Sequence, residues 1–128
     1  MNLKFNNLDR RYIDVPAPYF GLGPDGKEVV IRVNKRAVKH YIKASKLAIA
    51  VAERKDIRED DRIAYTVAAG LMSVCTIPET GEFAFADEQI DDLVHLLPRD
   101  LYESLASAAF ELDPVTETKT LTTKKKKS

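Results

Sequence analysis

Residues 80–112 constrain the fold more than any other part of this chain, because they combine a turn, a short extended piece and two helices. Gly81 follows Glu79-Thr80 in a turn, where glycine tolerates a positive φ that other residues avoid. Phe83 and Phe85 alternate with small residues, which is the period-2 pattern of a half-buried extended segment. Because the helices that follow carry apolar faces, the segment predicts a helical hairpin that closes a small core.

Both of these helices have recognisable end signals. Asp87 is the expected N-cap of a helix that runs to about Leu96, since its carboxylate can accept from the free N–H groups of the first turn. Pro98 suits the first turn of the next helix, where a missing N–H costs no intrahelical bond. The apolar stripe of that helix consists of Leu101, Leu105, Ala108 and Leu112. Phe110 lies on the opposite side, so it either contacts a second layer or remains exposed, and it is a candidate for contact with a partner or with a second copy.

Residues 12–33 predict a β-hairpin, preceded by a loose arm over residues 1–11. The returning strand alternates, and its apolar face consists of Val29, Ile31 and Val33. The connection over residues 16–26 is rich in proline and glycine, so it forms a wide loop. The large apolar side chains of this loop are Tyr19, Phe20 and Leu22. Because a wide loop can reach a neighbouring molecule, these three side chains are expected to take part in self-association.

A helix is expected from about residue 35 to residue 54, with Asn34 as its cap. Its first apolar face consists of Val38, Tyr41, Ile42, Ser45, Ile49 and Ala52. Leu47 and Val51 lie roughly opposite that face. A helix that is apolar around most of its circumference is normally buried on two sides. We therefore expect Leu47 and Val51 to contact a neighbouring copy or a partner protein.

The expected fold class is α+β, mainly α, with an N-terminal β-hairpin followed by about four helices. A further helix is expected from about residue 60 to residue 75, within a helical part that spans residues 35–112. Together with the arm and hairpin, this part forms a single globular domain over residues 1–112. Residues 113–128 contain many Thr and Lys residues and almost no apolar ones, so they are predicted to form a disordered tail.

The composition argues against several partner classes. The chain contains 20 Lys and Arg and 20 Asp and Glu residues, so no global field attracts nucleic acid. Its longest apolar runs are too short to span a bilayer, and no membrane partner is expected. Cys75 is the single cysteine and cannot form an internal disulfide, which favours a reducing cytosolic compartment.

Patterns typical of catalysis, cofactor binding or metal binding are not found in the sequence. His40 and His95 lie on separate predicted helices without partners at ligand spacing, so both are expected at the surface or its boundary. Cys75 is expected at a helix C-terminus, where the helix dipole opposes a thiolate. An enzyme is therefore not expected, and neither is a catalytic, cofactor or metal site.

The passage from Glu79 to Leu93 follows the pattern D/E-x-G-x-x-x-F-x-D/E-x-x-I/V-x-x-L. Its defining positions are Gly81, Phe85, Asp87, Ile90 and Leu93. Combined with the hairpin, the helices and a polar tail, this passage resembles the tail assembly chaperones of long, non-contractile-tailed bacteriophages. The resemblance covers residues 12–112 and rests mostly on core and turn residues.

A second feature agrees with that resemblance. Lys124, Lys125, Lys126 and Lys127 form a terminal lysine run that A-rich codons must encode. A terminal lysine run is commonly a solvated basic tail. In the chaperone family, however, a programmed −1 frameshift near the C-terminus also produces a longer form. The resemblance thus implies that this run marks a frameshift junction.

The resemblance further implies a chaperone that binds the tape measure protein and keeps it soluble in the host bacterial cytoplasm. Through the longer form, it would recruit tail tube subunits, and it would be absent from the mature virion. Homo-oligomers are expected. The alternative is a phage head–tail joining protein or a minor tail structural protein, and a small enzyme or regulator is a third possibility.

Overall fold

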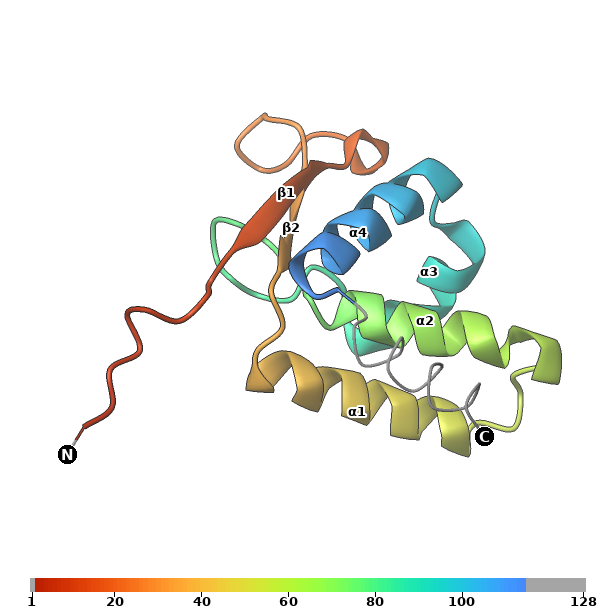
Figure 1. Ribbon diagram of the computed structural model, residues 1–128. Coiled ribbons are helices and arrows are strands. Elements are labelled where there is room, and N and C mark those ends of the chain that lie inside the picture. The colour runs from red at the N-terminus through yellow and green to blue at the C-terminus, as the bar shows by residue number, and fades with distance from the viewer. Residues whose placement is uncertain (1, 115–128) are drawn as a thin grey trace.

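A computed structural model describes residues 2–114, which contain a three-stranded sheet and four α-helices (Figure 1). The elements run in the order β1 (Tyr12–Pro16), β2 (Val30–Asn34), α1 (Val38–Glu53), α2 (Arg62–Met72), β3 (Cys75–Thr76), α3 (Ile90–Leu96) and α4 (Arg99–Leu112). Short 3₁₀ turns lie at Pro18–Phe20, Glu59–Asp61 and Asp87–Gln89. The expected α+β class, with a hairpin first and helices after it, is confirmed. Most of the predicted tail, including Lys124 to Lys127, lies outside the described residues.

The sheet is antiparallel, with β2 between β1 and β3. The expected hairpin is present, and Ile31 and Val33 point into the core. The third strand was not predicted, because Cys75 and Thr76 were assigned to the end of a helix. Instead α2 ends at Met72, and Cys75 pairs with Val33. Two-residue strands leave no periodic signal, and this one exists because the free edge of β2 lies beside it.

The connection after β3 confirms the turn and the extended piece of the predicted segment. Gly81 has a φ of 75°, and its N–H donates to the Ile77 carbonyl at 2.7 Å. The chain then runs back along β3, where the Ala84 N–H donates to the Cys75 carbonyl at 2.9 Å. Phe85 follows and is buried. The alternation of phenylalanines thus places one aromatic ring in the core.

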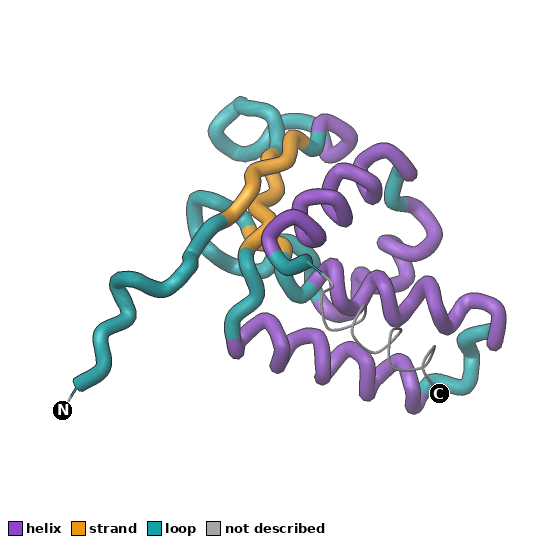
Figure 2. Tube along the Cα trace, in the orientation of Figure 1, coloured by secondary structure: helices purple, strands orange, loops and turns teal. Residues whose placement is uncertain are grey.

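Helix α4 lies against the sheet (Figure 1), a packing that the sequence did not predict. It contacts β1, β2 and α2. The predicted stripe residues Leu101, Leu105, Ala108 and Leu112 are all buried. Helix α2 occupies the middle of the helical part, since it also contacts α1 and α3. Figure 2 shows these helices forming most of the body, with the small sheet at one side.

Two predicted helix caps were wrong. Asn34 ends β2 and uses its side-chain amide to bind the Val74 carbonyl at 2.9 Å and the Thr76 hydroxyl at 2.8 Å, so it joins β2 to the segment of β3. Asp87 accepts from the Lys43 ammonium group at 2.7 Å and thereby ties the start of α3 to α1. The N-cap positions of α1 and of the 3₁₀ turn before α3 are both alanines.

At both alanine caps, a side chain three residues later accepts from the alanine N–H. His40 Nδ1 accepts from the Ala37 N–H at 2.8 Å, and Gln89 Oε1 accepts from the Ala86 N–H at 2.8 Å. This contact is the reciprocal half of a capping box, which satisfies an N–H that the helix itself leaves free. His40 was expected near the surface, but it is only 4% exposed. Its role as a cap acceptor explains the burial.

Candidate protein-interaction surfaces

Helix α1 buries the face that was expected to be free. Leu47 and Val51 are 3% and 5% exposed within the single chain, so the prediction that they contact a partner was wrong. Both belong to the buried core, and α1 packs along α2. The sequence shows two apolar faces on this helix, but only one of them is buried in the core of the single chain.

The opposite face of α1 is open to solvent along its whole length. We call it the outer stripe, and its large apolar members are Val38, Tyr41, Ile42 and Ile49. Val38 is 73% exposed and Ile49 is 59% exposed. Soluble proteins expose single apolar residues routinely, but a continuous row of them marks an interaction surface. The outer stripe carries more large apolar side chains than the buried side of the same helix.

A shallow groove between α2 and α4 is the second apolar surface. Two adjoining hollows of about 310 and 290 Å³ share Val67, Leu71 and Tyr102 in their walls. Phe110 lines the second hollow and is 54% exposed. The structure therefore answers the open question about Phe110, whose ring contacts no second layer of the described chain. A partner that contacts Phe110 would also contact this groove.

The loop between β1 and β2 exposes Tyr19, Phe20 and Leu22, the three expected self-association residues. It is less free than the sequence suggests. The Tyr19 hydroxyl donates to the Asp100 carboxylate at the start of α4, and the Phe20 ring lies 6.1 Å from the Phe85 ring. These contacts fold the first part of the loop against the helices. Its self-association stays a prediction.

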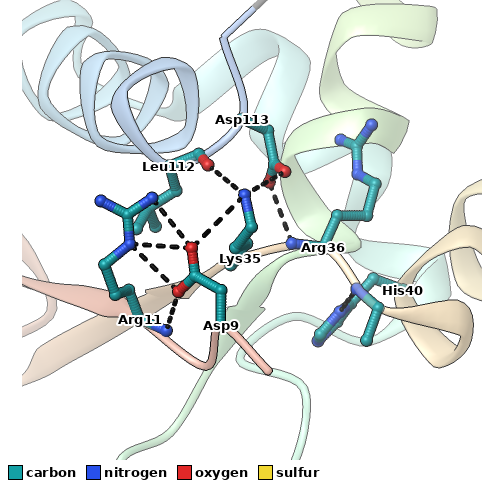
Figure 3. A network of polar contacts seen from close by, with 8 residues as sticks. Asp9, Arg11, Lys35, Arg36, His40, Leu112 and Asp113 are labelled. Atoms are coloured by element: carbon teal, nitrogen blue, oxygen red, sulfur yellow. Dashed lines mark hydrogen bonds and ion pairs between the residues drawn. The ribbon is translucent and has the colours of Figure 1, made fainter. Parts of the chain in front are cut away.

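A polar network joins the N-terminal arm, the start of the helical part and the end of α4 (Figure 3). Lys35 Nζ donates to the Leu112 carbonyl at 2.8 Å and lies 3.3 Å from the Asp113 carboxylate. A cation near the last carbonyls of a helix interacts favourably with the helix dipole. Asp113 also accepts from the Arg36 N–H at 2.9 Å. The described fold thus extends one residue past the predicted boundary at Leu112.

On the N-terminal side of the same network, the Asp9 carboxylate accepts from the Arg11 side chain at 3.0 Å and lies 3.8 Å from Lys35 Nζ. Arg11 holds the pKa of the Asp9 carboxyl below its usual range through this hydrogen bond. The large apolar residues earlier in the arm, Leu3, Phe5 and Leu8, are exposed. The network therefore fixes the arm only from Asp9 onward.

Groups with reactive potential occupy structural positions in the described chain. Burial raises the pKa of the Cys75 thiol to about 12, so the thiolate is suppressed. His95 lies at 3.3 Å from the Tyr65 hydroxyl, which donates to Asp91 at 2.6 Å. Arg54 completes this cluster by pairing with Asp91 at 3.0 Å. The cluster ties the end of α1 to α2 and α3.

The described residues hold neither a candidate metal cluster nor a candidate membrane span. Over residues 2–114, His, Cys, Asp and Glu side chains form no group of three or more that could hold a metal ion. The helices of this region also include none that is long and apolar enough to cross a bilayer. The candidate interaction surfaces of the described chain are therefore the exposed apolar surfaces of its helices.

Comparison with known proteins gives one structural likeness. No protein-family model and no curated protein matches the chain. Among solved structures, the fold is similar to one described as the structure of bacteriophage HK97 tail assembly chaperone, with a TM-score of 0.46 and 9% sequence identity. The match covers 78% of this chain and 83% of that chain. At this TM-score and identity the likeness assigns no function, and no residue role is transferred from it.

Proposed function

We propose that this chain is a phage tail assembly chaperone that binds the tape measure protein and keeps it soluble before the tail polymerises. The observation that carries the proposal is the outer stripe of α1, a row of large apolar side chains left open by the folded chain. A long helical partner with exposed apolar residues is liable to aggregate until those residues are covered. A small helical domain with surplus apolar surface can cover them.

The passage from Glu79 to Leu93 supplies core and turn residues of the domain. Phe85, Ile90 and Leu93 are buried, and Gly81 provides the positive φ of the turn. These residues therefore shape the domain and do not contact a partner. The contact residues lie on the exposed helix surfaces, where several copies along one partner would gain from effective concentration.

The proposal includes a longer form of the protein, made by −1 frameshifting at the codons for Lys124 to Lys127, which recruits tail tube subunits. It also includes self-association and action in the host bacterial cytoplasm, with no copies retained in the virion. The nucleotide sequence tests the first part directly. A slippery heptamer followed by an overlapping −1 frame is expected, and codons that cannot re-pair one base back would refute the frameshift.

Co-expression tests the binding function. The tape measure gene of the same genome is expressed alone, with this chain, and with a variant of this chain. Alone, the tape measure protein is expected in the insoluble fraction, and with the unaltered chain it is expected to be soluble and to co-purify with it. A tape measure protein that stays insoluble in both cases would refute the proposal.

Mass spectrometry of purified particles separates this proposal from the alternative of a head–tail joining or minor tail structural protein. A chaperone leaves no stoichiometric peptides in the virion. Finding this chain in mature particles at a fixed copy number would favour the structural role.

A further inference from the structure

Helix α1 exposes more large apolar side chains than it buries. A helix that only supports a core does the opposite. A surface helix normally buries its apolar stripe and exposes its polar face. Here Leu47 and Val51 are the large aliphatic residues on the buried side, whereas Val38, Tyr41, Ile42 and Ile49 form the exposed outer stripe. The helix has 16 residues, so the stripe is about 24 Å long. A stripe of this length matches one face of a second helix.

Small residues beside the stripe permit close approach. Ser45 and Ala52 lie within its line, and Ala48 lies on one edge, all of them exposed. Helices pack at interaxial distances of 8–10 Å when the side chains at the contact allow it. Large residues alternate with small ones along the outer stripe, which suits the insertion of side chains from a facing helix.

The other edge of the stripe carries two lysines and, at the C-terminal end of the helix, Glu53. Lys39 and Lys46 lie there, two helical turns apart, and both are exposed. Among the described residues, neither takes part in a salt bridge, whereas Lys43 is held by Asp87 at 2.7 Å. Lys39 lies in the first turn of α1, where the positive end of the helix dipole disfavours a cation. The placement of Lys39 and Lys46 therefore gives the folded chain no electrostatic benefit of its own.

We propose that the outer stripe of α1 docks an amphipathic helix whose apolar face is flanked by two carboxylates about seven residues apart. The carboxylates pair with Lys39 and Lys46, and the apolar face packs on Ile42 and Ile49. This inference rests on the proposed function, because it gives the chemistry that the chaperone selects in its partner. It predicts acidic-edged amphipathic segments in the tape measure protein.

Charge argues against a second copy of this chain as the occupant. When the same helix of two copies packs in an antiparallel, two-fold arrangement, equivalent edges face each other. Glu53 is the one acid of α1, so an antiparallel register can pair only one of the two lysines with a carboxylate, and the register that joins Lys39 to Lys46 brings like charges together. An acidic-edged partner can pair with both lysines at once. A lipid surface fits less well, because the lysines lie on one edge of the stripe and alanines on the other.

The test uses two synthetic amphipathic peptides with the same leucine stripe, which carry either two glutamates or two lysines at the seven-residue spacing. Binding to the full chain is measured by fluorescence anisotropy. At low salt the glutamate peptide is expected to bind roughly tenfold more tightly, since an exposed ion pair contributes up to about fivefold each. In about 1 M salt, where screening acts over roughly 3 Å, the difference should largely vanish.

Matched variants locate the contact. Ile42→Ser with Ile49→Ser should weaken binding of the glutamate peptide by more than tenfold, while Ile63→Ser with Leu96→Ser should leave it unchanged. All four side chains are exposed, so neither pair should disturb folding, and circular dichroism checks this. Lys39→Glu with Lys46→Glu should reverse the preference, so that the lysine peptide binds more tightly.

Several results would overturn the inference. One is equal binding of the two peptides at low salt. Another is that the peptide shifts backbone amide resonances in the α2–α4 groove instead of those in α1. A third is that the chain dimerises and the isoleucine variant does not. The surface would be assigned to lipid if the unaltered chain binds phosphatidylglycerol vesicles, the charge-reversed variant does not, and neither peptide is preferred. If the peptides behave as expected but the tape measure protein stays insoluble on co-expression, the proposed function fails and the docking surface remains.

Discussion

His40 gives the sharpest prediction about stability, because its imidazole must stay neutral to hold the start of α1. Its Nδ1 atom accepts from the Ala37 N–H at 2.8 Å, and a proton on Nδ1 would abolish this bond (Figure 3). Burial lowers the pKa of the imidazole, and the positive charges of Lys39 and Arg36 lower it further, against the opposing effect of Asp113. The folded state therefore favours the neutral ring.

Replacing His40 by alanine removes the cap acceptor and the edge-on packing of the ring on Phe83, whose centroid lies 6.4 Å away. Loss of the hydrogen bond from the Ala37 N–H to His40 costs about 1 kcal/mol. The space left by a buried ring adds a further cost of about 1–2 kcal/mol. Since about 1 kcal/mol changes the melting temperature of a domain this size by roughly 4 °C, His40→Ala should lower it by about 8–12 °C.

His40→Gln is the matched control, because glutamine already accepts from an alanine N–H at the start of α3, where Gln89 binds Ala86 at 2.8 Å. At pH 7.5 this variant should retain most of the stability. Below pH 6.5 the unfolded wild-type chain binds a proton at His40 before the folded chain does. Stability should then fall by up to about 1.4 kcal/mol per pH unit until the folded imidazole also titrates.

The assay is urea denaturation followed by circular dichroism at several values between pH 7.5 and 5.0. Acidic residues also contribute to the pH dependence, so the informative quantity is the difference between the wild type and His40→Gln. That difference should change steadily between pH 6.5 and 5.0. Parallel curves for the two proteins would refute the conclusion that the fold holds this imidazole neutral.

Three further predictions concern other parts of the structure. Cys75 should resist a disulfide reagent at pH 8 and react only as the protein unfolds, because burial raises the pKa of its thiol to about 12; rapid stoichiometric labelling of the native protein would contradict this. Lys35 binds the final carbonyl of α4, so Lys35→Met should lower the free energy of unfolding by about 1 kcal/mol and speed amide exchange in the last turn of that helix. Lys55→Met, at an exposed site, should do neither. Asp91→Asn should destabilise by about 1 kcal/mol and Tyr65→Phe by a similar amount, with a double variant less destabilised than the sum; strict additivity would mean that their hydrogen bond contributes nothing.

Local patterns were sufficient for much of the fold. The stripe of α4, the strand alternation around Ile31 and the turn at Gly81 all follow from periodicity or from a backbone angle that only glycine adopts easily. Each of these signals involves residues within a few positions of one another. For such features, the sequence carries the physical cause directly.

Contacts between distant segments explain what the sequence did not predict. Strand β3 needs the free edge of β2, which lies more than 40 residues earlier in the chain. The N-termini of α1 and of the 3₁₀ turn before α3 are capped by side chains three residues further on. The familiar cap residues Asn34 and Asp87 were therefore free to form long-range contacts instead. Neither outcome has a signature in a short window of sequence.

The two faces of α1 separate what the sequence predicts from what it cannot predict. Its sequence by itself determined that large apolar residues occupy opposite sides of one helix, since their spacing fixes their angular positions. Only the tertiary structure decided that Leu47 and Val51 enter the core and that Ile42 and Ile49 remain outside. The physical reason is that burial depends on the shape and free surface of α2, and the face left over becomes the surface available to a partner.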